Sequence, residues 1–205
     1  MKSIKKRDVS RIERKKEECR SKIIDTAVAL FSKKGIDGTT MEEIAETADF
    51  AKGTLYNYFP SKEIIIDEFI KRSFKRKNAD RIIKMKSLPD TVSRMKAMFT
   101  ELISGIGTQR ELFEKYIVSR MKAMISFRQR ESAKSGMYEL TGEIIRLGIE
   151  AGEIRSDLPL WSVVDFFEFC FIEAVKEFYF SRDDFDISYT VEKYVGLFMS
   201  GMRPL

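Results

Sequence analysis

The segment between Thr40 and Lys62 constrains the fold of this chain most, because two short helical patterns follow one another there with only two residues between them. The first begins with a capping box, in which the Thr40 hydroxyl and the Glu43 carboxylate can satisfy free backbone N–H groups. Its inward positions are Met41, Ile44, Ala45 and Ala48, and those of the second are Ala51, Leu55, Tyr58 and Phe59. Pro60 then stops the second helix. Two short helices joined by a tight turn predict a helix-turn-helix.

The second helix carries polar residues opposite its apolar seam. At 100° per residue, Gly53, Tyr56 and Asn57 point outward, and Lys52 and Thr54 lie on the flanks. Glycine costs about 1 kcal/mol of helix stability relative to alanine, so an exposed Gly53 indicates close approach of another molecule to the backbone. The second helix of such a motif enters the major groove, which predicts that this molecule is double-stranded DNA.

Each of these side chains can serve DNA recognition. Lys52 can reach a guanine edge or a phosphate, and Asn57 can hydrogen-bond a base edge. Thr54 can contact a thymine methyl group or a phosphate, whereas the Tyr56 hydroxyl can donate to a phosphate.

Three further features are expected near phosphates. Thr40 and Lys62 lie at helix N-termini, where free N–H groups and the helix dipole favour an anion, although Thr40 could act as a cap alone. Residues 1–20 hold nine Lys and Arg against four Asp and Glu, which predicts a mobile basic arm that could continue into the first helix. The arm could contact DNA or serve only as a solubilising tail.

Charge and composition exclude several classes of protein. Residues 1–86 carry 22 Lys and Arg against 14 Asp and Glu, a net +8, while the remainder is net −3, so the N-terminal part should bind a polyanion. The chain has no histidine and two cysteines, which argues against a metal site and against most acid-base catalysis. No run of eighteen apolar residues occurs and no apolar stretch follows the basic start, so we expect a cytoplasmic protein without membrane contact.

Helical periodicity extends along the whole chain, without a convincing strand pattern. A first helix from Ser21 should end at Gly35, and a long fourth helix should run from Ser61 to Lys86. Further helices are expected at about 90–106, 109–124, 127–150, 158–181 and 187–202. We predict an all-α fold with three parts: a basic arm (1–20), a three-helix helix-turn-helix domain (21–69) and a larger helical domain (70–205) that binds an effector and dimerises.

The C-terminal region is rich in aromatic residues. Half of the 24 aromatic residues fall between Trp161 and Phe198, and the helix there is apolar on more than one face. A helix buried on two sides needs two partners, its own core and a second copy of the chain. The expected dimer contacts are Phe167, Phe178, Tyr194 and Phe198.

Six of the ten methionines lie between Met85 and Met137. Methionine suits a cavity for varied apolar ligands, but it also fills irregular cores, and both interpretations stay open. If a pocket for a small apolar or amphipathic effector exists, its expected wall is Met95, Met98, Phe99, Met121, Met124 and Phe127, with Phe169 or Phe171 opposite.

The stretches Thr39-Thr40-Met41-Glu42-Glu43-Ile44-Ala45 and Lys52-Gly53-Thr54-Leu55-Tyr56-Asn57-Tyr58-Phe59-Pro60-Ser61-Lys62-Glu63 resemble the tetracycline-repressor (TetR) family. The resemblance implies a homodimer that binds a palindromic operator, usually as a repressor released by a ligand. It places Thr40, Lys52, Gly53, Thr54, Tyr56, Asn57 and Lys62 at the family's usual DNA-contact positions. This chain departs from the family in its turn, Asp49-Phe50-Ala51, where a glycine, a smaller apolar residue and a serine are usual, and in Asn57, where a histidine is common.

Two other functions remain as alternatives. An architectural protein would coat DNA through charge alone, with affinity insensitive to sequence but steeply dependent on salt. The largely uncharged outward face of the second helix argues against it. An enzyme has less support, because the sequence lacks histidine, a glycine-rich phosphate loop and a nucleophile-base constellation. No cofactor is expected.

Overall fold

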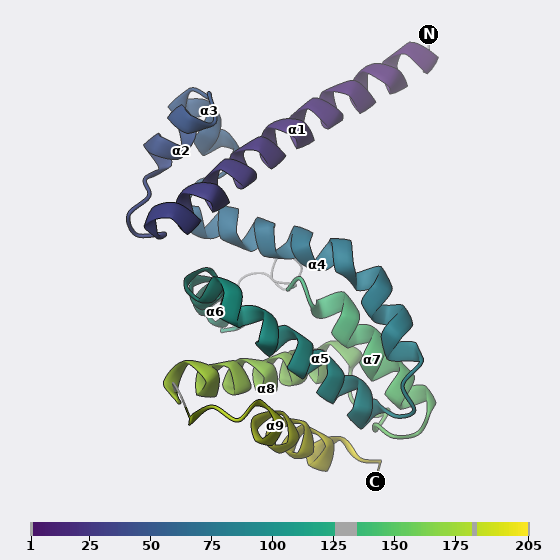
Figure 1. Ribbon diagram of the computed structural model, residues 1–205. Coiled ribbons are helices and arrows are strands. Elements are labelled where there is room, and N and C mark those ends of the chain that lie inside the picture. Colours follow the sequence, from purple (N-terminus) through teal and green to yellow (C-terminus); the bar gives the residue numbers. More distant parts are fainter. Residues whose placement is uncertain (1, 126–134, 182–183, 205) are drawn as a thin grey trace. The chain divides into compact units, whose positions relative to one another are not determined.

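A computed structural model describes residues 2–125, 135–181 and 184–204, with only the backbone of residues 2–10 and 108 described. Within these ranges the regular elements are nine α-helices and one 3-10 turn, without a strand, which confirms the all-α prediction (Figure 1). The chain divides into two compact units. The first comprises Met1–Ile70 with Glu114–Ser119, and the second comprises Lys71–Phe113 with Arg120–Leu205.

The N-terminal unit is built from α1 (Lys2–Lys34), α2 (Met41–Thr47), α3 (Lys52–Tyr58) and the first part of α4 (Lys62–Lys86). Its buried core includes Ile23, Ala27, Phe31, Ile44, Leu55, Phe59, Ile65 and Ile66. Helix α1 ends where expected, because Gly35 adopts a left-handed conformation with φ 79° and donates its N–H to the Phe31 carbonyl at 2.9 Å.

The basic segment expected as an arm is helical, in line with the alternative that it continues into the first helix. Helix α1 begins at Lys2 rather than near Ser21, and its first half extends beyond the rest of the N-terminal unit (Figure 1). The physical reason is local: Lys, Arg and Glu have high helix propensity, no Gly or Pro interrupts them, and charges four residues apart pair, as Arg14 does with Glu18 at 3.5 Å. Residues 11–18 are exposed, so tertiary packing adds nothing there.

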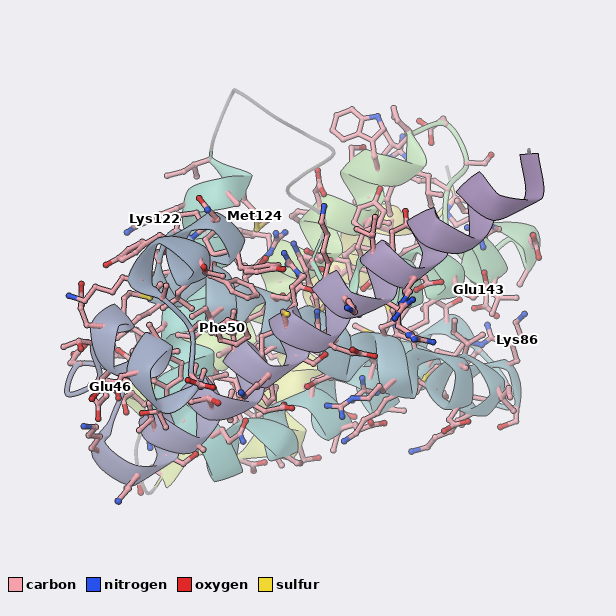
Figure 2. The ribbon with its side chains drawn as sticks, turned by 90° about the horizontal axis from the view of Figure 1, so that it is seen from above. Glu46, Phe50, Lys86, Lys122, Met124 and Glu143 are labelled. Atoms are coloured by element: carbon pink, nitrogen blue, oxygen red, sulfur yellow. The ribbon has the colours of Figure 1, made fainter. Side chains whose placement is uncertain are left out.

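The C-terminal unit contains the second part of α4 and the five following α-helices. These are α5 (Thr91–Ile106), α6 (Arg110–Met124), α7 (Tyr138–Glu150), α8 (Leu160–Phe180) and α9 (Ile187–Met202). Helices α5, α7, α8 and α9 pack together, and Lys86 at the end of α4 pairs with Glu143 of α7 at 2.9 Å (Figure 2). Helix α8 is aromatic, yet none of the described helices is long and apolar enough to cross a membrane.

Four of the five helix ranges expected in this unit agree with the structure to within about two residues. The exception is the range 127–150, because the described part of α7 begins only at Tyr138, after a turn at Gly136 and Met137. Glycine is easily accommodated in a turn, and a Cβ at position 136 would lie 2.8 Å from the Phe74 ring, so a larger residue would clash there. Residues 126–134 lie outside the described chain.

Candidate nucleic-acid interface

The turn between α2 and α3 has the geometry of a helix-turn-helix. Asp49 adopts φ 59°, a left-handed conformation that aspartate tolerates, though less easily than the glycine usual at this position. The Asp49 N–H donates to the Glu46 carbonyl at 3.1 Å, and the Phe50 N–H donates to the Ala45 carbonyl at 2.8 Å. These bonds close the end of α2 and direct the chain into α3.

Helix α3 and the residue that follows it bury two side chains, and the remaining residues are half-buried or exposed. Leu55 and Phe59 are fully buried, Tyr58 and Thr54 are half-buried, and the four exposed residues are Lys52, Gly53, Tyr56 and Asn57. Ala51 was expected on the buried side, but it is exposed. The predicted buried face assumed that the helix begins at Ala51. Ala51 is instead an extended N-cap residue with ψ 143°, and α3 begins at Lys52.

Gly53 is not required by the packing of this chain. A Cβ built at Gly53 would meet no other atom within 4 Å, so an alanine would fit there and favour the helix. The glycine therefore leaves open space on the exposed face of α3, where the backbone is accessible to another molecule.

Thr40 and Lys62 have defined roles within the chain. The Thr40 side chain accepts a hydrogen bond from the Glu43 N–H at 3.1 Å, which confirms its capping role, while the Glu43 carboxylate pairs with Lys34. The Lys62 ammonium donates to the carbonyls of Ile36 at 2.6 Å and Thr39 at 2.8 Å. Lys62 thus fixes the loop that leads into α2, and its contact with a phosphate stays a prediction.

One carboxylate on the exposed side of α2 was missed at the sequence level. The Glu42 side chain accepts a hydrogen bond from the Tyr56 hydroxyl at 3.4 Å and lies 3.7 Å from the Lys52 ammonium. A hydrogen bond from its own backbone N–H, followed by the charge of Lys52 and the Tyr56 hydroxyl, lowers the pKa of Glu42. Partial loss of hydration and the nearby carboxylate raise the pKa of Tyr56. These contacts of Glu42 depend on the conformation of the turn, so the spacing of the two helices in the sequence could not predict them.

The expected effector wall is brought together in part. Met95, Met98, Phe99 and Phe171 are buried, and the Phe99 ring lies 5.1 Å from that of Phe171. Met121 and Phe169 are 37% and 46% exposed, Met124 is half-buried, and Phe127 lies outside the described residues. Phe167 fills the space beside Phe99, with ring centroids 4.9 Å apart, so core filling is the better-supported reading of these four buried side chains.

The four expected dimer contacts stay a prediction. Phe167 and Phe198 are fully buried and lie ring to ring at 5.1 Å within one protomer, so they pack in its core and not on its surface. Phe178 packs against Phe185, and the Tyr194 hydroxyl donates to Glu177 at 3.0 Å. The side chains that α8 and α9 leave exposed are instead Leu160, Trp161, Phe166, Phe169, Phe180, Tyr189 and Leu197.

A buried ion pair also escaped the sequence analysis. Glu168 of α8 lies 3.5 Å from Arg120 of α6, and both side chains are less than 10% exposed. Burial raises the pKa of Glu168, whereas Ser135 and Arg120 oppose that effect. The sequence signal for this pair was Glu168, a carboxylate in the middle of an aromatic helix. The described residues include no cluster of side chains suited to a metal ion.

The arrangement of α1 to α3 defines the class of this N-terminal unit: it is a helix-turn-helix domain. A family model described as bacterial regulatory proteins, tetR family, matches residues 23–69, which assigns this domain to the tetR family. A match to regulatory proteins agrees with the expectation that the chain is not an enzyme.

Known relatives extend this result. The biofilm operon negative transcriptional regulator IcaR of Staphylococcus aureus (strain Newman) is 46% identical over 55 residues, which span 27% of this chain and 30% of IcaR. The transcriptional repressor KstR2 of Rhodococcus jostii (strain RHA1) is 25% identical over 143 residues, or 69% of this chain and 70% of KstR2. The crystal structure of Thermus thermophilus FadR with lauroyl-CoA covers 89% of this chain and 94% of FadR, with a TM-score of 0.73 at 21% identity, and shows a shared fold.

Proposed function

We propose that this chain is a cytoplasmic transcriptional repressor that binds an inverted-repeat operator as a homodimer and is released by a small apolar or amphipathic ligand. The observation that carries the proposal is the exposed face of α3, where Gly53 leaves open space between Lys52, Tyr56 and Asn57. A polar, largely uncharged face suits base readout in the major groove better than binding through charge alone. Thr40, Thr54 and Lys62 supply the neighbouring phosphate contacts in this proposal.

Substitutions on α3 should separate base readout from phosphate contact. Asn57→Ala should relax the preference at one operator position by about 1–3 kcal/mol, because a side chain that reads a base edge is lost. Tyr56→Phe should weaken binding equally on all sequences, because a phosphate contact carries no sequence information. Competition binding with operators mutated one position at a time measures both effects. A uniform loss for Asn57→Ala would contradict its role in readout.

The homodimer is assigned to the exposed apolar side of α8 and α9. Phe166 and Phe169 are 41% and 46% exposed on one side of α8, and Leu197 is 60% exposed on α9. The Phe166 ring also stacks on the buried Phe198 at 5.7 Å, which ties this surface to the core of the unit. Two copies of a helix pair joined in this way form a four-helix interface, the arrangement that bundles use to bury such stripes.

Ligand control is assigned to the C-terminal unit, between Pro89 and Phe180. FadR binds lauroyl-CoA according to its structure, and an apolar chain suits a methionine- and phenylalanine-rich interior that can rearrange around a guest. Helix α4 runs from the N-terminal unit into the C-terminal unit, so its shift is the proposed lever between ligand and DNA. A ligand acts only through its different affinities for the DNA-competent and DNA-incompetent states.

Thermodynamic reciprocity tests this control. If lauroyl-CoA is an effector, operator DNA should weaken its binding by the same factor by which it weakens operator binding, typically about 5–150-fold. Calorimetric titrations of lauroyl-CoA into the free protein and into the operator complex give that factor. Equal affinities in the two titrations would exclude control by this ligand.

A further inference from the structure

Glu42 of α2 engages two of the side chains that face DNA in the proposed function. Its Oε1 accepts from the Tyr56 hydroxyl at 3.4 Å and lies 3.7 Å from Lys52 Nζ. The Lys52 and Glu42 side chains are 67% and 46% exposed and Tyr56 is an exposed residue, so water could solvate all three and burial does not force the contacts. A carboxylate therefore occupies the donors that a DNA phosphate would use.

A phosphate and the Glu42 carboxylate compete for the same donors and repel one another. We propose that Glu42 is a selectivity residue: it holds Lys52 and Tyr56 against α2 in the free protein and penalises DNA that offers phosphates alone. On an operator Lys52 can contact a guanine edge instead of a phosphate, whereas on other DNA it has only a phosphate to contact and brings that phosphate next to the Glu42 carboxylate. The inference rests on the proposed function, in which α3 enters the major groove.

The other two glutamates of α2 are placed differently. The Glu43 carboxylate pairs with Lys34 of α1, and its backbone N–H donates to the Thr40 cap. Glu46, one turn beyond Glu42, is exposed and has no ion pair with α3 among the contacts described for this chain (Figure 2). Glu46→Gln therefore changes the net charge of the same helix by the same amount as Glu42→Gln without freeing Lys52 or Tyr56.

The test measures the affinity of the full chain for an operator duplex and for a scrambled duplex by fluorescence anisotropy, at several salt concentrations. Glu42→Gln should raise affinity for the scrambled duplex on the order of fivefold, the effect of one unit charge about 4 Å away in water. Affinity for the operator should rise less, so the ratio of the two affinities falls. For the scrambled duplex, the slope of log affinity against log salt concentration should become steeper by about one released counterion, because Lys52 becomes free to contact a phosphate.

Glu46→Gln should raise both affinities slightly and equally. In a Lys52→Ala, Tyr56→Phe background, Glu42→Gln should lose its effect on the selectivity ratio. Equal effects of the Glu42 and Glu46 substitutions would overturn the proposal, and so would an undiminished Glu42 effect without the two donors. A wild-type protein that binds operator and scrambled duplexes equally would instead refute the proposed function itself, whatever Glu42 does. Circular dichroism verifies that each variant is folded.

Discussion

Phe167→Ala should lower the free energy of unfolding by about 3–5 kcal/mol, the usual cost of replacing a buried phenylalanine by alanine. Phe167 is fully buried, and its ring contacts Phe99 at 4.9 Å and Phe198 at 5.1 Å, so truncation leaves a cavity where α5, α8 and α9 meet. Urea denaturation followed by circular dichroism measures the loss.

Phe180→Ala is the matched control, because it makes the same truncation on the same helix at a side chain that is 79% exposed. Its expected cost is below about 1 kcal/mol, since little area is returned to water. Similar losses for the two variants would show that Phe167 is not the centre of the core.

Phe166→Glu should dissociate the dimer while leaving the protomer folded. The side chain is 41% exposed in the protomer, so a carboxylate there stays hydrated in the monomer but is buried without a partner in the dimer. Because two linked recognition helices gain avidity that one lacks, operator affinity should fall by about 100-fold or more. Analytical ultracentrifugation and operator titration measure both changes.

Ile83→Glu provides the comparison for Phe166→Glu. It places the same charge at an exposed apolar residue of α4, outside α8 and α9, and should leave the dimer and operator binding unchanged. A Phe166→Glu protein that is folded and still dimeric would refute the assigned interface.

The helix-turn-helix could be predicted from the sequence because its signals are local. The cap at Thr40, the left-handed turn at Asp49 and the stop at Pro60 each act within a few residues, and the structure places α2 and α3 where these signals predict them. Ala51 was wrongly predicted to be buried because it lies at a helix boundary, where the regular 100° rotation per residue no longer describes the backbone. For residues 2–20 the sequence left a mobile arm and a continuation of the first helix open, because high charge is typical of disorder while charged residues of both signs also favour helix.

The dimer contacts and the effector wall could not be predicted in the same way, because they depend on tertiary packing. Phe166 and Phe167 are neighbours on α8, which is apolar on two faces, and only its packing against α5 and α9 determines that Phe167 turns inward. Met121 was likewise expected in the effector wall from its residue type alone, but it is 37% exposed. The Arg120–Glu168 pair joins residues 48 positions apart, and no local pattern links them.

The most direct test of the proposed function is selection of duplexes from a random DNA pool by the purified full chain. A symmetric dimer that inserts α3 into successive major grooves should select an inverted repeat whose half-sites lie about 34 Å apart or at a multiple of that distance. Recovery of such a repeat by the wild-type chain is the result that the proposed function predicts. A pool without any enriched motif, bound with steep dependence on salt, would contradict it and favour an architectural DNA-binding protein.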